Sequence, residues 1–438
     1  MLRRAFSPSP LHGRPPRPAL RPVLAGRPVA FPPLPLRVLL VSWEYPPIVE
    51  GGLARHVRKL AEALVAEQDV EVHVLTRGGA GARAEEERNG VLVHRFPEPP
   101  KPSDLPEFVT WVQRMNADLL GHGLELCQEH RFDLVHGHDW LVAVAAKRLA
   151  DAIGRPYVTT VHATEFGRHQ GWVHEEPQSG IHRTERWMCH VADQVITCSH
   201  YMRGHVADVF GLDEARVEVI PNGIDPLDLQ TVDDLEALRA RFAQPGEQLV
   251  LLVGRLVYEK GFQHALDALG GPDGVLGRLD GVRFLVAGSG THEQELKRQA
   301  RKLGLDAHGT FLGWIGDDVL HSLYRIADLT VVPSIYEPFG LVALEAMASG
   351  CPCIVADTGG LREVVPEGDR VGLRFRGGDS AHLAVMIERM LTDRPLRERL
   401  VAQATEHVLR FDWNDVAAQT AATYEALLEA ARWPHPAR

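Results

Sequence analysis

The chain has 438 residues, 45% of them hydrophobic, and a formal net charge of −11. This length predicts two to three domains, and the hydrophobic content is sufficient for real cores. The negative charge, together with the lack of a zinc-finger, basic-helix or RNA-binding motif, argues against a nucleic-acid-binding protein.

The cysteines and the hydropathy pattern indicate a compartment. Five cysteines are an odd number and mostly lie far apart, and Cys351-Pro-Cys353 is too tight for the usual CxxC metal or redox spacing. No apolar run approaches the roughly 18–20 residues that a membrane span requires. We therefore expect a cytoplasmic protein without an integral membrane segment.

Residues 1–36 are rich in proline and arginine and contain no acidic residue. This composition cannot form a packed core and predicts a disordered tail. Its prolines interrupt the continuous apolar region that a secretory signal needs, so export is not expected. A start codon assigned too early would explain the tail equally well.

In the first half of the chain, apolar runs typical of buried strands alternate with helical segments. The expected strands cover residues 37–42, 70–75, 91–96, 133–137, 157–161, 194–198 and 217–220. The expected helices cover about 53–66, 105–130, 141–153 and 181–191, with a short one after residue 198. This alternation predicts a doubly wound parallel sheet with helices on both faces.

Regular strand signals stop after residue 224 and resume near residue 249. The second set of expected strands covers 249–253, 282–287, 308–312, 329–332 and 353–356. Its expected helices cover 261–269, 292–303, 317–326, about 341–350, 380–393 and 396–408, followed by a last helix at 413–431. The fold class is α/β, with two Rossmann-like domains at 37–225 and 247–412 and a linker at 226–246.

The segment from Pro333 to Gly350 predicts a strand, a loop and a helix. The first backbone N–H groups of this helix, near Phe339, Gly340 and Leu341, lack intrahelical partners and attract phosphate. Glu337 lies in the loop, where it can face a hydroxyl-rich group, and Glu345 lies inside the helix, where it can accept from ribose hydroxyls. A sugar nucleotide fits this order, although an exposed glutamate on an alanine-rich helix is more commonly just solvated.

A second loop follows the first strand of the second domain and carries Arg255 and Lys260 between Gly254 and Gly261. A departing nucleoside diphosphate carries two to three negative charges, which cations must hold if no metal does so. The arginine can bind two phosphate oxygens, and the lysine supplies a point charge beside them. Taken alone, two such cations in a loop are more often surface residues.

Histidines end two neighbouring strands of the first domain. His162 ends the strand at 157–161, and the loop at 167–172 offers His169 and Trp172, whose indole face suits a sugar. His136-Gly-His138-Asp139-Trp140 offers similar groups from the neighbouring strand. Two histidines two residues apart plus an aspartate could instead be a metal site, but no further ligand set is visible.

These motifs in register resemble the retaining glycosyltransferases of family 4. Gly-Arg-x4-Lys-Gly and Glu-Pro-Phe-Gly-Leu with a second glutamate eight residues later look like their diphosphate-binding and donor-binding signatures. The resemblance covers roughly residues 37–413 and implies the two-domain GT-B fold, with the last helix returning to the first domain. It also implies a nucleotide-sugar donor and no metal cofactor.

The resemblance implies a role for each candidate residue. His162, Glu337, Arg255 and Lys260 would be the catalytic group, with His162 on the donor sugar and Glu337 orienting that sugar. No covalent nucleophile is evident, so the acceptor would attack on the face from which diphosphate leaves. The donor-binding set is Gly51, Gly52, Arg255, Lys260, Glu337, Phe339, Gly340, Leu341, Glu345, Gly359 and Gly360; the acceptor-binding set is Asp139, Trp140, His169 and Trp172.

Further motifs resemble the bacterial family 4 enzymes that extend α-(1→4)-glucans. They are Ser42-Trp-Glu-Tyr-Pro-Pro with Gly51-Gly-Leu, His138-Asp-Trp140, His162-Ala-Thr-Glu165 and Gly167-Arg-His-Gln-Gly-Trp172. Classical bacterial glycogen synthases have Lys-x-Gly-Gly in the first loop, where this chain has Val49-Glu50-Gly51-Gly52. UDP-glucose and ADP-glucose therefore both remain candidate donors.

The expected function is transfer of glucose from a nucleotide sugar to the nonreducing end of an α-glucan. Three alternatives share parts of this pattern. A family 4 mannosyltransferase would act on a lipid or glycan, a UDP-sugar 2-epimerase would need no acceptor, and a nonenzymatic glucan-binding protein would need no phosphate site.

Overall fold

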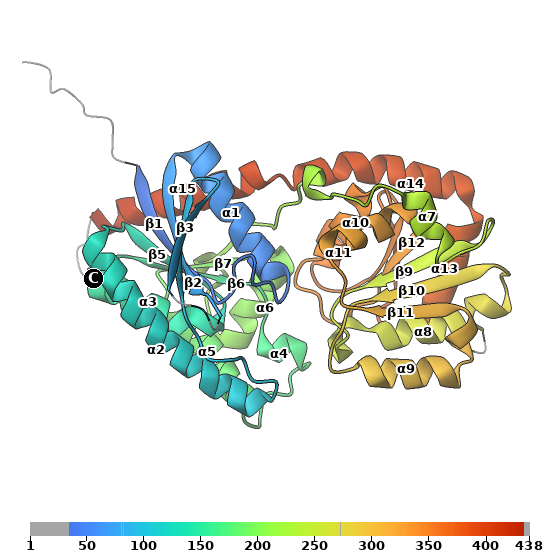
Figure 1. Ribbon diagram of the computed structural model, residues 1–438, viewed down its shortest axis with the longest axis horizontal. Coiled ribbons are helices and arrows are strands. Elements are labelled where there is room, and N and C mark those ends of the chain that lie inside the picture. The colour runs from blue at the N-terminus through green and yellow to red at the C-terminus, as the bar shows by residue number, and fades with distance from the viewer. Residues whose placement is uncertain (1–34, 80, 82, 272, 433–438) are drawn as a thin grey trace, which may run out of the picture. The chain divides into compact units, whose positions relative to one another are not determined.

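The computed structural model describes residues 35–432, except residues 80, 82 and 272. The predicted tail, apart from its last two residues, lies outside this range. The described chain contains an eight-stranded and a six-stranded sheet, each covered by helices (Figure 1). The predicted pair of doubly wound α/β domains is thereby confirmed.

The first sheet has the strand order β3-β4-β2-β1-β5-β6-β7-β8, and only the pairing of β3 with β4 is antiparallel. Its strands are β1 Leu36–Val41, β2 Val70–Arg77, β3 Ala84–Arg88, β4 Val91–Phe96, β5 Leu134–His138, β6 Tyr157–Val161, β7 Gln194–Thr197 and β8 Val217–Val219. The helices between them are α1 Gly52–Gln68, α2 Leu105–Glu129, α3 Ala143–Ile153, α4 Glu165–Arg168, α5 Gln178–Val191 and α6 His200–Phe210.

Strand β1 shows why helices must cover both faces of this sheet. Val38 and Leu40 point into the core under α1, whereas Leu39 and Val41 point into the core under α2 and α3. Side chains alternate between the faces of a strand, so an uninterrupted apolar run needs apolar cover on both sides.

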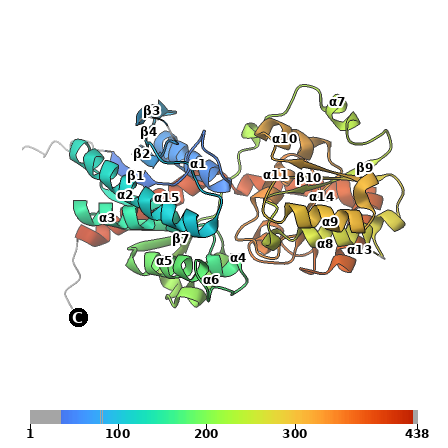
Figure 2. The same ribbon diagram turned by 60° about the horizontal axis from the view of Figure 1, so that its bottom comes forward.

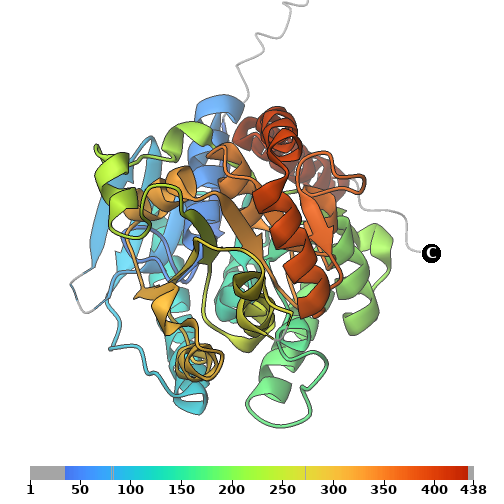
Figure 3. The same ribbon diagram turned by 90° about the vertical axis from the view of Figure 1, so that its right-hand side faces the viewer.

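The second sheet has the order β11-β10-β9-β12-β13-β14 and is parallel throughout. Its strands are β9 Gln248–Val253, β10 Val282–Ala287, β11 Gly309–Gly313, β12 Leu329–Val332, β13 Cys353–Ala356 and β14 Leu373–Phe375. The covering helices are α8 Phe262–Gly270, α9 Glu293–Lys302, α10 Asp317–Ile326, α11 Leu341–Ala348, α12 Leu361–Val364, α13 Ser380–Thr392 and α14 Arg394–His407. Figure 2 shows α8, α9 and α13 packed together, and Figure 3 shows α13 beside α14.

Both strand orders reverse at a central pair of neighbours. The reversal lies between β1 and β5 in the first sheet and between β9 and β12 in the second. The loops at the carboxyl ends of such strands diverge, which is where open parallel sheets bind ligands. The predicted site motifs follow β1, β5, β6, β9, β12 and β13.

The last helix, α15 Trp413–Arg432, packs against α1 and completes the first domain, as the resemblance implied. Val416, Ala417 and Tyr424 are buried in the same core as Val38 and Leu40 of β1. The predicted linker is less independent than expected. Its short helix α7, Leu235–Ala240, packs on α10, and Arg239 pairs with Asp328 at 2.8 Å, so this segment belongs to the second domain.

Two strands were missed from the sequence. Strand β3 is Ala-Glu-Glu-Glu-Arg, an exposed edge strand held partly by ion pairs such as Glu86 with Arg95 at 2.8 Å. It shows no alternation of apolar residues, which is the signal that identifies strands. Strand β14 has only three residues, too few for a periodic pattern.

Docking of α15 gives a pH-dependent stability. Tyr424 of α15 lies 2.6 Å from Nδ1 of His136, whose Nε2 lies 2.7 Å from Oγ1 of Thr160. Burial lowers the pKa of His136 to about 3, whereas an unfolded histidine titrates near 6.5. The unfolded chain therefore takes up a proton first, so this stabilisation is complete above about pH 6.5 and is lost as pH falls toward 3.

Lowering the pH from about 7.5 to 5 is expected to reduce the free energy of unfolding of wild type by about 2 kcal/mol more than that of His136→Gln, because the variant lacks this titration. Urea unfolding at the two pH values measures the difference. The exposed His174, replaced by glutamine, is the matched control and should keep the wild-type dependence. Equal losses in wild type and His136→Gln would contradict the assignment.

Candidate active site

Two loops predicted separately meet in one ion pair. Glu337 follows β12 and is 8% exposed, and its Oε2 lies 2.8 Å from Nζ of Lys260 and accepts a hydrogen bond from Oγ of Ser334 at 3.0 Å. Lys260 ends a 3-10 turn that follows β9, the neighbour of β12. Adjacent parallel strands thus bring the carboxylate and the cation together at the carboxyl edge of the sheet.

Glycines allow the backbones around Glu337 to touch. Gly360 donates its N–H to the carbonyl of Glu337 at 2.9 Å, and a Cβ on Gly359 would lie 2.2 Å from that same oxygen. A Cβ on Gly261 would lie 2.0 Å from the carbonyl oxygen of Pro333. Gly359 and Gly360, which were predicted to bind the donor, therefore also support the Glu337 loop.

We expect Gly359→Ala to cost about 1–3 kcal/mol of stability and to lower transfer activity at least about tenfold, because φ is +51° and the new Cβ displaces the Glu337 backbone. Thermal unfolding and initial rates measure the two effects. Gly304 has a φ of +71° with nothing within 4 Å of a built Cβ, so Gly304→Ala controls for backbone strain alone. A Gly359→Ala enzyme as active as this control would contradict the prediction.

Arg255 follows β9, in the loop that also carries Lys260. Its side chain is 56% exposed, with Glu259 at 4.0 Å. Desolvation and the positive charge of Arg168 lower its pKa. Arg168 belongs to α4 in the first domain and was not predicted as a site residue. Arg168 lies 3.6 Å from Glu165 and 4.0 Å from Glu185, so its charge is partly offset within the first domain, and Arg255 is the more available of the two cations for an anion.

His162, at the end of β6, is held by its neighbours. Its backbone N–H donates to Oδ1 of Asp139 at 2.8 Å, its Nε2 lies 3.1 Å from Nδ1 of His138, and its ring packs on His56 with centroids 4.6 Å apart. Burial and then the charge of Arg168 lower the pKa of His162 to about 4. The imidazole is therefore neutral at neutral pH and can exchange a hydrogen bond with a sugar hydroxyl.

The potential metal ligands here differ from those considered in the sequence. His136 is engaged by Tyr424 and Thr160, and Asp139 by the backbone of His162. Instead, His56, His138 and His162 each place a ligand atom within 4.8 Å of the others. This triad is mostly buried and consists of imidazoles alone.

The four predicted acceptor residues separate into two pairs. Trp140 is 8% exposed and belongs to the hydrophobic core, so its ring offers no face to a sugar, and Asp139 is a buried support for His162. The polar residues before Trp140, at the end of β5, gave no indication in the sequence that its side chain points into the core. His169 is 42% exposed beside Glu165, and Trp172 is 77% exposed, so both remain available to an acceptor.

Helix α11 follows the Glu337 loop as predicted, with Gly340 at its N-cap at a φ of 122°. Phe339 is buried against Phe411, so only its backbone can face a ligand. Glu345 accepts from the hydroxyl of Tyr324 at 2.9 Å and pairs with Nη1 of Arg55 at 3.3 Å. Gly52 lies close to Leu341, because a Cβ built on Gly52 would be 3.2 Å from Cδ1 of Leu341.

Of these residues, Gly52, Arg55, Leu341 and Glu345 line a cavity of about 310 Å³. It also includes Lys59, Asp225, Asp317 and His321. The side chain of Glu345 is 12% exposed at this cavity, and its partners Tyr324 and Arg55 must share the carboxylate with any ribose hydroxyl.

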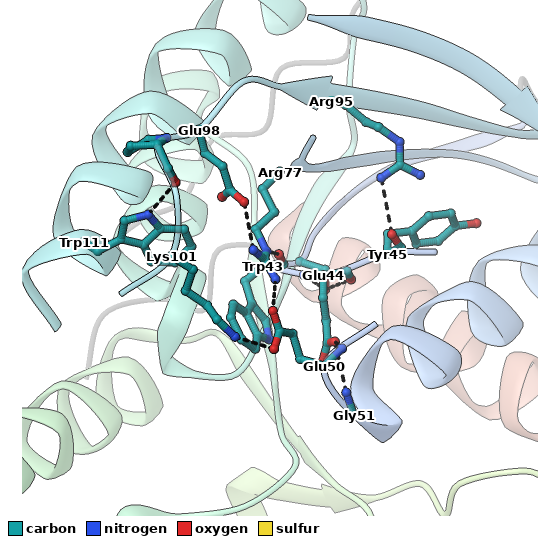
Figure 4. Close-up of polar contacts among 12 residues, drawn as sticks. Trp43, Glu44, Tyr45, Glu50, Gly51, Arg77, Arg95, Glu98, Lys101 and Trp111 are labelled. Atoms are coloured by element: carbon teal, nitrogen blue, oxygen red, sulfur yellow. Dashed lines mark hydrogen bonds and ion pairs between the residues drawn. The ribbon is translucent and has the colours of Figure 1, made fainter. Parts of the chain in front are cut away.

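The loop after β1 is fixed by charges (Figure 4). Glu44 accepts from the N–H groups of Glu50 and, at 3.3 Å, Gly51. Arg77 joins Glu50 at 2.6 Å to Glu98 at 2.8 Å, and Lys101 also pairs with Glu50. Glu50 follows Val49, the position at which classical bacterial glycogen synthases have a lysine. Its charge is therefore neutralised by Arg77 and Lys101 of the first domain.

The fold and the site define a glycosyltransferase with two Rossmann-like domains. Residues 50–227 match the model of Glycosyltransferase Family 4, and residues 234–407 match that of Glycosyl transferases group 1. The chain therefore belongs to glycosyltransferase family 4 and has the GT-B fold.

Individual proteins agree with this assignment over nearly the whole chain. The glycogen synthase of Mycobacterium tuberculosis is 37% identical over 414 residues, which cover 92% of this chain and 97% of that protein. An uncharacterised glycosyltransferase of Methanocaldococcus jannaschii is 34% identical over 400 residues, covering 90% and 99%. The structure of sucrose-phosphate synthase from Thermosynechococcus elongatus has a TM-score of 0.76 at 25% identity, covering 90% and 100%.

No helix within the described part of the chain combines the length and apolar character that crossing a membrane requires.

Proposed function

We propose that this glycosyltransferase moves glucose from a nucleotide-glucose donor to the nonreducing end of an α-(1→4)-glucan, with retention of configuration. The observation that carries the proposal is the 37% identity to a glycogen synthase over nearly the full length of both chains. The Glu337–Lys260 pair, Arg255 with Arg168, and the exposed Trp172 would supply the chemistry that this reaction needs, which supports the proposal.

The cations would act on the leaving group. Arg255 would bind the diphosphate, and the positive charge of Arg168, which lowers the pKa of Arg255, would add to the attraction for the same anion. The negative charge on the diphosphate grows as the glycosidic bond breaks, so this stabilisation increases toward the transition state. The N-terminus of α11 would add backbone N–H groups to the same anion.

Glu337 and His162 would hold the sugar. Lys260 and Ser334 fix one carboxylate oxygen of Glu337, which suits orientation of sugar hydroxyls better than covalent attack. Neutral His162 would hydrogen-bond a sugar hydroxyl from the other domain. The glucan hydroxyl then attacks on the face from which diphosphate leaves, and a diphosphate oxygen takes its proton.

Trp172 and His169 would bind the glucan. The indole is 77% exposed and can stack on a pyranose, and the half-exposed imidazole can bind its hydroxyls. Both lie in the segment that follows α4, the helix that carries Arg168.

A donor and acceptor panel tests the proposal. Purified protein is incubated with UDP-glucose, ADP-glucose, GDP-mannose or UDP-N-acetylglucosamine, with maltooligosaccharide or without an acceptor, and nucleotide release is measured. Inositol 3-phosphate is a further acceptor, because a relative from Nocardia farcinica named D-inositol 3-phosphate glycosyltransferase is 31% identical. Glucan-dependent release from a glucose donor is expected, with elongated products that carry α-(1→4) linkages.

Each other outcome replaces the proposal with a stated alternative. Turnover of GDP-mannose indicates a mannosyltransferase, and acceptor-free turnover of the acetamido sugar indicates an epimerase. Turnover only with inositol 3-phosphate would agree with a family 4 glycosyltransferase but would exclude a glucan as its acceptor. Glucan binding without any turnover indicates a nonenzymatic binding protein.

A further inference from the structure

A group of histidines and carboxylates lies on the first sheet, near the amino end of β2. The candidate active-site residues, by contrast, follow the carboxyl ends of the strands. Glu71 and His73 are two residues apart on β2 and so share a face, and His130 immediately follows α2. Each of the three places one ligand atom within 4.8 Å of the others. Neither the family resemblance nor the proposed transfer uses any of them.

The distance between two of these ligand atoms already suits a tetrahedral metal site. Ligands about 2.0–2.2 Å from a Zn²⁺ ion lie roughly 3.3–3.5 Å from one another. Nε2 of His73 is already 3.2 Å from Oε1 of Glu71. His130 is half-buried at the helix end, where rotation of its side chain can bring a nitrogen to the same centre.

The remaining atoms of these side chains are already oriented by the protein. Nδ1 of His73 lies 3.0 Å from Nε2 of His94, and Nδ1 of His94 lies 3.5 Å from Oε1 of Glu85. Nε of Arg37 pairs with the other oxygen of Glu71 at 2.8 Å. Metal-bound histidines characteristically donate their second N–H to such a partner, and His94 is positioned to accept it from His73.

We propose that Glu71, His73 and His130 bind one transition-metal ion of the Zn²⁺ class, with His94 holding the ring of His73. Two imidazoles and a carboxylate suit Zn²⁺ and its neighbours in the first transition row, and they suit Mg²⁺ or Ca²⁺ poorly. Water completes the coordination on the exposed side. The ion ties β2 to the end of α2 and stabilises the first domain, without a part in glycosyl transfer.

A hydrogen-bonded network without a metal ion is the competing explanation for this arrangement. With hydrogen in place of metal, His94 donates to His73 and His73 donates to Glu71, which satisfies these groups without an ion. The two explanations differ in the role of His130, which contributes a ligand in the first and only an edge-to-face contact with His73, at 4.6 Å between centroids, in the second.

The experiment uses the full chain without a polyhistidine tag, treated with a chelator and then dialysed. Isothermal titration with ZnCl₂ is expected to give one site per chain, and Zn²⁺ is expected to raise Tm. Co²⁺ in its place should give the visible absorption of a low-coordinate N/O site. Glu71→Gln and His130→Ala should each weaken Zn²⁺ binding by more than about tenfold, and His94→Gln by about 10- to 100-fold.

His122→Ala is the matched control, because His122 lies on the same helix α2 outside the cluster and should keep the wild-type affinity. Both ligand changes replace partly exposed side chains, so the variants are expected to fold, which circular dichroism checks. Failure of wild type to bind Zn²⁺ would overturn the proposal. Undiminished binding in both Glu71→Gln and His130→Ala would also overturn it and would direct attention to the triad of His56, His138 and His162.

Discussion

Glu337→Gln is expected to lower kcat for transfer by about 10²- to 10³-fold, the size of effect seen when one preorganised polar group is removed from an active site. The substitution keeps the shape of the side chain but removes the charge that Lys260 and Ser334 hold in place. Donor affinity should change much less, because most of the binding comes from the nucleotide and diphosphate. Initial rates over a range of donor concentrations at saturating acceptor separate kcat from KM.

Glu398→Gln provides the control for the loss of one carboxylate. Glu398 lies on α14, is 62% exposed and pairs only at the surface with Arg394. Its replacement should leave kcat within about twofold of wild type. If Glu337→Gln were as active as this control, Glu337 would not contact the reacting sugar, and the shared ion pair would be structural.

Lys260→Met is expected to lower kcat by a similar factor and also to raise KM for the donor. The lysine contributes positive charge beside the leaving diphosphate and fixes Glu337 at 2.8 Å. The variant leaves a largely buried carboxylate without its cation, so part of the loss arises from a misplaced Glu337. Kinetics of the double variant with Glu337→Gln should show non-additivity, because the two residues act as a unit.

Lys147→Met is the matched control, since Lys147 forms a surface pair with Asp151 on α3. It should change neither constant appreciably. Strict additivity of Lys260→Met and Glu337→Gln would show that the two side chains act independently, against the ion pair in the structure. Loss of donor affinity with an unchanged kcat would restrict Lys260 to ground-state binding.

The sequence predicted the fold well where burial decides structure. The runs at β1 and β9 are apolar at successive positions because both faces of their sheets are covered, and both were identified. Strand β3 was missed because its stability comes from pairing with β4 and from ion pairs, which depend on residues elsewhere in the chain.

The structure brings together two site residues that short motifs predicted separately. Lys260 and Glu337 were each proposed from a local pattern, and the order of β9 and β12 in the sheet brought them together. Trp140 was placed at the acceptor, but its side chain packs inward, and no local pattern reports that direction. Arg168 was overlooked because its relation to Arg255 exists only after two domains have folded.

The position of α15 has a consequence for biosynthesis. The first domain's sheet is complete at β8, near residue 219, yet part of its apolar core is filled by Val416, Ala417 and Tyr424. On the ribosome, α1 can cover part of that face early, but the part that α15 fills stays uncovered until nearly two hundred further residues have been made, at roughly 5–20 residues per second. The second domain, by contrast, has all its elements through α14 before then. We therefore expect the domain that begins the chain to be the later of the two to reach its final packing, and to be the one that chaperones protect.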